Sequence, residues 1–397
     1  MKKYLLSMVL VGFAFTANAG NGDDAIFLHM GKDIFNSLSK DFKERFKVYE
    51  KNEEKVLLET DRDALPWISQ LIHRRFQQCG GFQTYFDKKE AVEDFHKKVV
   101  FLKAANEVEL YGLNQEKNVL QMMPDVVSEN IKETIVKLSS YHNRYYDAQT
   151  GVDAVTWIKN HWEDLIQSRS DAKVEFFNHS RWAQPSVILT IEGSSKKDEI
   201  VVVGGHADSI AGFWGRSTAR APGADDNASG IATMTETIRV LVKNNFKPER
   251  TVKFMAYAAE EVGLLGSKEI AKSFKKADKN VIGALQLDMT NFNGSEQEIV
   301  MMSDFTDAGQ NRFIGSLLSK YQKNVSWGYD KCGYACSDHA SWHQQGYPAS
   351  MPFEATKSKM NKKIHTAGDT ISVSGDNAIH AAKFARLAVS YVAELSN

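Results

Sequence analysis

Two adjacent carboxylates, Glu260 and Glu261, lie at the end of a largely apolar stretch of the sequence. The stretch 252–259 is typical of a buried strand in a parallel sheet, and ligands collect at the carboxyl ends of such strands. Desolvating two neighbouring acids is costly unless a positive charge lies beside them. The pair is therefore either a solvated surface turn or part of a site that holds a cation.

Further imidazole and carboxylate side chains follow other predicted strands, begin a predicted helix or lie late in the chain. They are His206 with Asp208 after the strand 200–203, Asp225 with Asp226 before a helix, Asp288 at the end of the strand 284–288, and His365 with Asp369 late in the chain. Because parallel strands end at one edge of a sheet, we expect these side chains to meet there. Imidazole and carboxylate ligands without thiolates suit zinc, with manganese or cobalt as substitutes. Their number exceeds what one zinc ion needs, which favours two ions that share a bridging carboxylate.

The elements that must position these residues follow from hydrophobic periodicity. Ser128 is expected to cap the first helix of the main domain. Strand and helix alternate, so we predict one large α/β domain over residues 106–397, with a mostly parallel mixed central sheet flanked by helices. The predicted helices are 128–138, 151–166, 233–242 and 264–274, and the predicted strands are 174–177, 186–191, 200–203, 252–259 and 284–288.

The N-terminal part of the sequence has a different character. Lys2 and Lys3 precede an apolar stretch and the sequence Ala17-Asn18-Ala19, a pattern that predicts a signal peptide over residues 1–19 and a secreted protein, exported through the periplasm in a bacterium. A membrane anchor is disfavoured because the apolar stretch is shorter than the roughly 20 residues of a span. Residues 20–105 contain no cluster of ligand-type residues, and we expect a small propeptide-like segment there rather than a plain accessory domain.

Composition and cysteine usage limit the partners. The formal net charge of -1 leaves no basic excess to neutralise phosphates, so nucleic acid is not an expected partner. The sequence contains no long apolar repeat of the kind that would indicate an obligate assembly. We therefore expect a monomer with no membrane contact after signal cleavage. Cys332 and Cys336 lie close in sequence, and in an exported protein a disulfide between them is favoured over a thiolate metal site. Cys79 would leave with a cleaved propeptide.

Several long runs of the sequence closely resemble the secreted bacterial leucyl aminopeptidases, a family of co-catalytic di-zinc exopeptidases. The resemblance covers the chain from about residue 119 onward. It implies a zinc-exopeptidase-like fold, two Zn²⁺ ions per catalytic domain, and the N-termini of peptides or proteins as substrate. The matching runs are 204–206 (GGH), 221–226 (APGADD), 254–264 (FMAYAAEEVGL), 284–291 (ALQLDMTN) and 332–343 (CGYACSDHASWH).

The resemblance assigns the metal ligands position by position. It implies that His206 and Asp288 bind one ion and that Glu261 and His365 bind the other. Asp226, the second aspartate of its pair, would bridge the two ions, and similar proteins have a cis peptide after this residue. These roles are expectations for the structure to test.

Glu260 is the acid of the pair that this assignment does not use as a metal ligand. A carboxylate within hydrogen-bond reach of a zinc-activated water can accept its proton and return it to the departing amine. Asp208 would hydrogen-bond the imidazole of His206 and fix its tautomer. Glu260 is thus predicted to be the general base and acid.

The resemblance also implies an apolar pocket for the first side chain of the substrate. Lys357 and Met360 stand where close relatives have aromatic residues, which makes the rim of this pocket wider, more flexible or more polar. We expect a preference for Leu and other large apolar residues, broader than in the relatives. The matching pocket positions are Met289, Met302, Cys332, Tyr334, Cys336, Met351, Phe353 and Ile364.

Two other functions compete with this one. A glutaminyl-cyclase-like single-zinc acyltransferase would use the same fold, but the runs 221–226 and 254–264 match aminopeptidases more closely. A non-catalytic binding protein is disfavoured because every ligand position and the base position hold competent residues. The metal content of the mature chain discriminates among the three.

Overall fold

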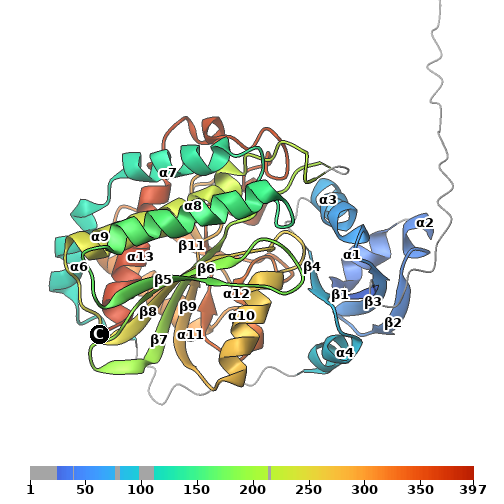
Figure 1. The fold of residues 1–397 in the computed structure, drawn as a ribbon, viewed down its shortest axis with the longest axis horizontal. Helices are drawn as coiled ribbons and strands as arrows, with labels where there is room; N and C mark the ends of the chain where they lie inside the picture. Colours follow the sequence, from blue (N-terminus) through green and yellow to red (C-terminus); the bar gives the residue numbers. More distant parts are fainter. Residues whose placement is uncertain (1–24, 39, 77–80, 98–110, 213–215) are drawn as a thin grey trace, which may run out of the picture.

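The computed structural model describes residues 25–397 except 39, 77–80, 98–110 and 213–215. The predicted signal peptide and Cys79 lie outside the described residues. The chain forms a large α/β unit and a smaller unit, residues 25–96, that lies beside it (Figure 1). Among the described residues, no helix has the length and apolar character needed to cross a bilayer.

A six-stranded mixed sheet forms the centre of the large unit, in the strand order β12-β9-β7-β8-β6-β5. The first four strands run parallel to one another, and β6 and β5 are each antiparallel to their neighbour. The mostly parallel mixed sheet that the sequence predicts is therefore confirmed. Its strands are β5 (Ala172–Phe177), β6 (Ser186–Ile191), β7 (Lys196–His206), β8 (Arg250–Tyr257), β9 (Asn280–Gln286) and β12 (Ala349–Ser350).

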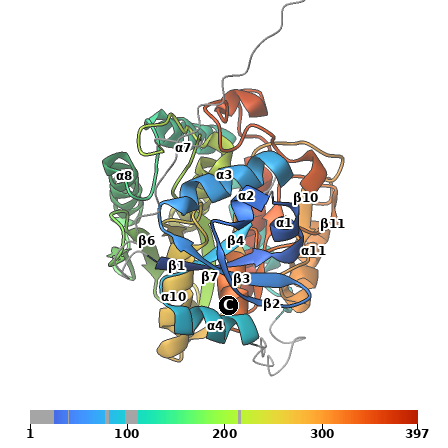
Figure 2. The same cartoon turned by 90° about the vertical axis from the view of Figure 1, so that its right-hand side faces the viewer.

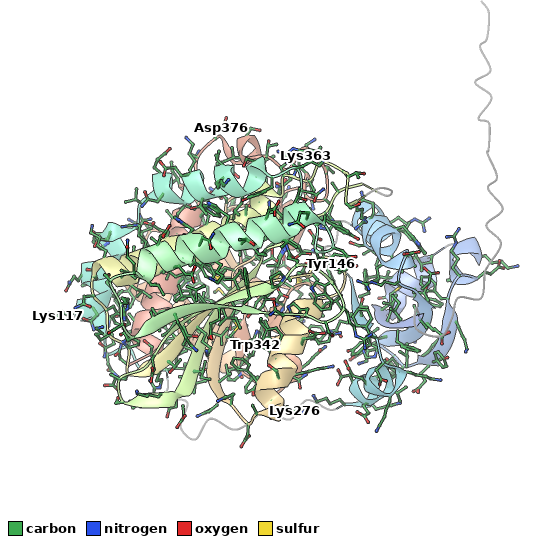
Figure 3. All side chains as sticks on the ribbon, viewed as in Figure 1. Lys117, Tyr146, Lys276, Trp342, Lys363 and Asp376 are labelled. Carbon is green, nitrogen blue, oxygen red and sulfur yellow. A yellow bond between two sulfur atoms is a disulfide. The ribbon has the colours of Figure 1, made fainter. Side chains whose placement is uncertain are left out.

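Helices cover both faces of this sheet because successive strand residues point to opposite sides. On β7, Val201 and Val203 join the core beneath α8 (Gln149–Ile166), α9 (Gly230–Lys243) and α13 (Ala381–Leu395). Ile200 and Val202 of the same strand join the core beneath α10 (Leu265–Lys276) and α12 (His339–Gln344). Figure 3 labels Trp342 of α12 beside α10 on this second face.

The remaining elements of the large unit surround this core. A second, three-stranded sheet in the order β11-β10-β13 lies outside the central one. Its strands are β10 (Ile299–Met302), β11 (Trp327–Asp330) and β13 (Pro352–Phe353), and the other helices are α6 (Glu116–Met122), α7 (Ser128–Ser140) and α11 (Ala308–Tyr321). Short helical turns complete the unit at Met123–Asp125, Ala224–Ser229, Lys357–Lys359 and Ile371–Ser374.

The small unit has its own four-stranded antiparallel sheet, in the order β2-β3-β1-β4 (Figure 2). Leu28 and Met30 of β1 and Val56 and Leu58 of β3 form its buried centre. The described elements are β1 (Ala25–Gly31), β2 (Lys47–Lys51), β3 (Lys55–Asp61), β4 (Phe82–Tyr85), α1 (Lys32–Ser37), α2 (Lys40–Lys43), α3 (Ala64–Phe76) and α4 (Lys88–His96). Residues 25–96 thus contain a folded unit, and the role of residues 20–105 as a propeptide stays a prediction.

Several element bounds differ from the sequence predictions by a few residues, such as the end of β8 at Tyr257 instead of 259, and one predicted helix cap is wrong. Helix α7 begins at Ser128, but Val127 is the N-cap and no side chain caps the helix, so the predicted Ser128 cap is wrong. Ser128 is already helical, and the Val127 amide instead donates to Glu236 Oε1 at 2.7 Å. Strand β9 starts four residues before the predicted 284–288 and ends at Gln286, which leaves Asp288 in the loop that follows.

Candidate metal centre

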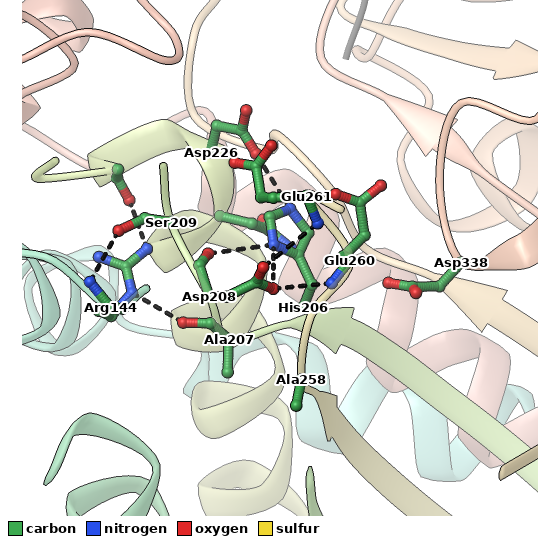
Figure 4. A network of polar contacts seen from close by, with 12 residues as sticks. Arg144, His206, Ala207, Asp208, Ser209, Asp226, Ala258, Glu260, Glu261 and Asp338 are labelled. Atoms are coloured by element: carbon green, nitrogen blue, oxygen red, sulfur yellow. Dashed lines mark hydrogen bonds and ion pairs between the residues drawn. The ribbon is translucent and has the colours of Figure 1, made fainter. Parts of the chain in front are cut away.

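Three strand ends and one helix start bring the candidate ligands together. His206 is the last residue of β7, the turn after β8 carries Glu261, and Asp288 lies two residues beyond β9. Asp226 lies in the turn that leads into α9, and His365 belongs to the loop that precedes Ile371–Ser374. All five residues are at least 97% buried. Figure 4 shows His206, Asp226 and Glu261 converging from separate segments.

The five residues form two groups that share Asp226. In the first group, His206 Nε2 lies 3.0 Å from Asp226 Oδ1 and 3.4 Å from Asp288 Oδ1. In the second group, His365 Nε2 lies 3.2 Å from Asp226 Oδ2 and 2.7 Å from Glu261 Oε2. The ligand atoms of each group lie within 4.8 Å of one another. Asp226 thus directs one oxygen into each group, as a bridging carboxylate would.

The residues fit metal ions because their polar atoms face one another and not hydrogen-bond partners elsewhere in the described part of the protein. His206 Nε2, Asp226 Oδ2, both Glu261 carboxylate oxygens and Asp288 Oδ1 are buried, and the contacts that they make are with other members of the two groups. Buried polar atoms are normally satisfied, so several buried acceptors at one place call for a cation. Imidazole and carboxylate donors at three positions per ion suit zinc. Two such groups that share a carboxylate match a two-ion centre.

The charges of the histidines in the two groups affect the pKa values of the carboxyl groups beside them. Burial alone would raise the pKa of Asp226, but the hydrogen bonds and charges of His206 and His365 hold it below its usual range. Burial raises the pKa of Glu261 to about 7, against the opposing effect of His365. The protein therefore holds Asp226 ionised more readily than Glu261, and a cation beside them would favour the charged form of both.

Glu260 projects from the same turn as Glu261 but belongs to neither ligand group. Its side chain is 1% exposed, and its Oε1 has no hydrogen-bond partner. Burial, opposed by His206 and reinforced by the charge of Glu261, raises the pKa of Glu260 well above its usual range. A buried carboxyl beside a metal centre, free to exchange a proton, is suited to general acid and base work.

Asp208 supports the Glu260–Glu261 turn from inside the site. Its carboxylate oxygens accept hydrogen bonds from the backbone amides of Glu260 at 3.0 Å and Glu261 at 3.2 Å. Oδ1 also lies 3.4 Å from His206 Nδ1, whose nearer contact is the Asp208 carbonyl oxygen at 3.2 Å. The carboxylate of Asp208 therefore lies beside the imidazole of His206, and in addition it accepts from two amides of the turn (Figure 4).

A layer of buried acids supports the turn that carries Asp226. Asp369 accepts hydrogen bonds from the amides of Asp225 at 3.3 Å and Asp226 at 3.1 Å. Asp225 belongs to neither ligand group and accepts instead from the Asn291 amide and the Asn361 side chain, both at 3.1 Å. The peptide bond between Asp226 and Asn227 is cis, as the resemblance implied. Asp369 is a supporting residue that the sequence marked only as a neighbour of His365.

Arg144 is a supporting residue that the sequence pattern did not reveal. Its buried guanidinium donates to the carbonyl oxygens of Ala207 at 2.9 Å, Pro222 at 2.5 Å and Gly223 at 2.9 Å. It thereby links the end of β7 to the turn before Asp226. Burial lowers its pKa to about 10 despite the surrounding acids. A lone arginine before a predicted helix gives no signal of this role.

Asp338 is a second residue that sequence reasoning missed, although it lies in the run 332–343. Its Oδ2 accepts from Gln286 Nε2 at 3.0 Å, and its buried Oδ1 has no hydrogen-bond partner. Burial raises its pKa to about 7. Figure 4 shows its carboxyl group on the side of Glu260. The proximity of the two acids arises from the fold, because 78 residues separate them in sequence.

Two glycines allow the ligand-bearing segments to approach one another. A Cβ atom at Gly230, the first residue of α9, would lie 2.2 Å from the Leu287 carbonyl oxygen. A Cβ atom at Gly205, beside His206, would lie 2.7 Å from the same oxygen. Real Cβ atoms do not approach a backbone oxygen so closely. The segments that carry Asp226, His206 and Asp288 can therefore lie this close together only because these two positions have no side chain.

The predicted pocket residues form one buried apolar cluster. Met289 and Ile364 connect it to the metal centre, since each is the immediate neighbour of a candidate ligand. Lys357 reaches the cluster, with Nζ 3.2 Å from the Tyr334 hydroxyl and 3.5 Å from Met360 Sδ. The cluster consists of Met289, Met302, Cys332, Tyr334, Cys336, Met351, Phe353, Met360 and Ile364.

The predicted disulfide between Cys332 and Cys336 is present. The amides of Cys332 and Gly333 donate to the Asp304 carboxylate, which fixes the loop that the disulfide closes. Because both sulfur-bearing residues belong to the apolar cluster, the disulfide forms part of the wall beside the metal centre.

Comparison with known proteins places the chain among peptidases. The model of peptidase family M28 matches residues 186–390, a range that contains both ligand groups. The chain is 39% identical to leucine aminopeptidase 1 of Uncinocarpus reesii over 286 residues, which cover 68% of this chain and 71% of that protein. It is 35% identical to the probable leucine aminopeptidase 1 of Trichophyton verrucosum over 357 residues, 86% of this chain and 92% of that protein.

Solved structures share the fold. The LapA aminopeptidase of Legionella pneumophila superposes with a TM-score of 0.82 and 26% identity, covering 94% of this chain and 98% of that chain. An alignment of that extent reaches into the small unit as well as the large one. The glutaminyl cyclase of Porphyromonas gingivalis has a TM-score of 0.55 and 13% identity over 68% of this chain and 98% of that chain. At that identity the likeness shows the fold alone. The relatives come from fungi as well as bacteria.

Proposed function

The chain belongs to peptidase family M28 and is a metallo-aminopeptidase, and from this premise we propose that it removes N-terminal leucine and other large apolar residues from peptides at a two-zinc centre. The observation that carries the proposal is the pair of buried groups of imidazole and carboxylate ligands that share Asp226, with the ligand atoms of each group within 4.8 Å of one another. The leucine aminopeptidases that resemble the chain support the leucine preference.

The proposed ligands divide between two ions. His206 and Asp288 would hold one zinc ion, Glu261 and His365 the other, and Asp226 would bridge them. Bound zinc would supply Lewis acidity and lower the pKa of a nearby water towards neutrality. Asp208 orients His206 and holds the turn that carries Glu261, so the protein presents these ligands with little reorganisation.

Glu260 is proposed to move the proton. It takes a proton from the attacking water as the water oxygen bonds to the scissile carbonyl carbon. It then gives that proton to the departing amine as the carbon–nitrogen bond breaks, so that Glu260 ends the cycle unchanged. Its position beside Glu261, its burial and its unpaired Oε1 support this role.

The apolar cluster next to Asp288 and His365 is proposed to receive the first side chain of the substrate. Its methionines adapt to unbranched and branched apolar groups alike. Lys357, which contacts Tyr334 and Met360, places a positive charge at this cluster and supports a preference broader than that of an all-apolar pocket.

The substitution Glu260→Gln tests the central assignment. We expect this variant to keep its metal while the kcat for leucyl-anilide falls about 100- to 10,000-fold, the usual loss of a general acid–base group. Glu296→Gln, which changes an exposed glutamate in the same way, is the matched control. Normal turnover by Glu260→Gln would contradict the mechanism.

The metal content and the product test the enzyme class. We expect two zinc ions per chain and release of free leucine from leucyl peptides. A cyclase on this fold would instead bind one zinc ion and release ammonia from an N-terminal glutamine. That product, without leucine release, would overturn the proposed activity.

Three further points about the mature protein are proposed. It is secreted after removal of residues 1–19, it acts as a monomer, and residues 20–105 are a propeptide that precedes the catalytic domain 106–397. N-terminal sequencing and the mass of the secreted protein in solution test all three, because they give the processing site and the number of chains.

A further inference from the structure

Strand β4 of the small unit lies against the backbone that follows Glu260 and Glu261. Thr84, in the middle of this strand, donates from Oγ1 to the Val262 carbonyl oxygen at 2.8 Å and from its amide to the Gly263 carbonyl oxygen at 3.3 Å. Its own carbonyl oxygen accepts from Lys268 Nζ at 2.6 Å. Thr84 is 1% exposed, so these contacts are shielded from water. One residue of the small unit is thus bound at two points to the segment between β8 and α10 and at a third point to α10 itself.

The segment between β8 and α10, which Thr84 contacts, has a backbone conformation that needs support from neighbouring residues. Ala259 and Leu264, on either side of the two glutamates, have positive φ angles of 57° and 61°. Gly263 has φ +104°, and a Cβ atom there would lie 2.4 Å from Thr84 Oγ1. Non-glycine residues hold such conformations only where the surrounding structure fixes them. Asp208 fixes the turn from the metal side, and Thr84 fixes it from the opposite side.

The apolar contacts around Thr84 extend the same support. A single buried cluster joins the core of the small unit to the large unit. Its members from the large unit are Tyr146, Trp182, Ile210, Ala258, Ala259, Val262 and Leu265. Ala259 and Val262 flank the two glutamates directly, and Ala258 precedes Ala259. Figure 1 shows β4 at the boundary between the two units, and Figure 3 labels Tyr146 on the side of the large unit that faces the small one.

We propose that Thr84 is a positioning residue, through which the small unit holds the Glu260–Glu261 turn in its working shape. The contacts reach backbone oxygens behind the turn, whereas the two glutamate side chains lie with the ligand groups on its other side. While the small unit is attached to the large one, it therefore supports the metal centre by holding this turn. This support is separate from any role of the small unit in maturation. This inference rests on the proposed roles of Glu260 and Glu261.

The test uses the full chain with single substitutions. Thr84→Val keeps the shape of the side chain and the two backbone contacts but removes the hydroxyl donor to Val262. Thr84→Ser keeps the hydroxyl. Thr60→Val makes the same change at a buried threonine of β3 in the same sheet and is the matched control. For each variant, kcat and KM for leucyl-anilide, zinc content and the melting temperature are measured.

We expect the kcat of Thr84→Val to fall about tenfold with KM within twofold of the parent, since small misplacements of catalytic groups cost rate. Thr84→Ser should keep at least half of the parent kcat, and Thr60→Val should match the parent. A fall in zinc content of Thr84→Val alone also supports the inference, because Glu261 lies on the turn.

An unchanged kcat and zinc content in Thr84→Val would overturn the inference. So would an equal loss in Thr60→Val, or a failure of Thr84→Ser to restore activity, because each indicates general destabilisation. Failure of the proposed function is distinguishable, since the parent chain itself would then lack zinc or leucine release.

Discussion

Replacing Asp208 by asparagine should weaken metal binding and turnover while leaving the fold intact. Asp208 accepts from the amides of Glu260 and Glu261 with its two oxygens, and Oδ1 lies 3.4 Å from His206 Nδ1. Asparagine has the same shape but only one carboxamide oxygen. Its amide group would turn a donor towards one of the two backbone donors, so one bond is lost and the other loses its charge.

The expected magnitude follows from these contacts. A hydrogen bond to a charged acceptor contributes about 1.5–3 kcal/mol, and a buried amide left unpaired costs about 1–3 kcal/mol. Losing the bond and leaving its amide unpaired are largely the same loss, so the turn should be held more weakly by about 1.5–3 kcal/mol. Loss of a residue that supports metal ligands typically costs about 10- to 100-fold in metal affinity or activity. That range corresponds to about 1.4–2.8 kcal/mol, which agrees with the estimate from hydrogen bonds.

Competition with a chromogenic chelator measures the zinc affinity, and leucyl-anilide hydrolysis at saturating zinc measures kcat and KM. The matched control is Asp198→Asn, an exposed aspartate on the same strand β7. Thermal unfolding of both variants without metal shows whether the fold is retained. We expect the zinc affinity and kcat of Asp208→Asn to fall, with little change in KM.

The reasoning would be refuted if Asp208→Asn bound zinc within twofold of Asp198→Asn and turned over substrate at the same rate. The carboxylate would then be unnecessary for holding either His206 or the two glutamates.

Three other predictions concern the metal, the backbone and the pH dependence. Removing zinc with a chelator should lower the melting temperature, since bound metal stabilises the folded state by about 4 kcal/mol at a thousandfold excess over Kd; an unchanged melting temperature would contradict a tightly bound centre. Gly230→Ala should destabilise the fold by at least about 1–3 kcal/mol and lower zinc content, because its Cβ would collide with the Leu287 carbonyl oxygen; denaturant unfolding measures this, and parent-like stability would refute it. Burial, with a contribution from Lys272, lowers the pKa of Lys268 from 10.5 to about 7. The unfolded chain therefore binds more protons between pH 7 and 10.5, so parent stability should rise with pH across that window. Lys268→Met should remove this rise in pH-dependent unfolding, and an unchanged slope would count against the buried amine.

The order of elements in the large unit could be predicted because hydrophobic periodicity is local. Helix α7 starts where the pattern placed it, and the strand ends carry the ligand-type residues. The end of β9 was less predictable. The amide of Leu287 still donates to the Gly204 carbonyl oxygen at 2.7 Å, although the regular strand ends at Gln286. The apolar run is therefore longer than the strand, and Asp288 lies in the loop that follows. Periodicity cannot mark where pairing stops within such a run.

The supporting residues could not be predicted because their partners are distant in sequence. Asp369 binds amides 143 and 144 residues earlier, and Arg144 binds carbonyl groups more than 60 residues later. The small unit shows the same limit, since β1 pairs with β3 and β4 across intervening helices. Residue types identify candidate ligands, whereas support for those ligands depends on contacts that only the folded chain creates.

The disulfide in the apolar wall affects how inhibition experiments on this enzyme are interpreted. Thiol reagents such as dithiothreitol bind zinc and also reduce disulfides, so they would act on the metal centre and on the Cys332–Cys336 loop together. Loss of activity in such a reagent therefore does not identify the metal as its target. A phosphine reductant that binds zinc poorly and a carboxylate chelator that leaves disulfides intact separate the two effects. The same loop gives the pocket a dependence on the redox state of its surroundings that the metal centre alone would not have.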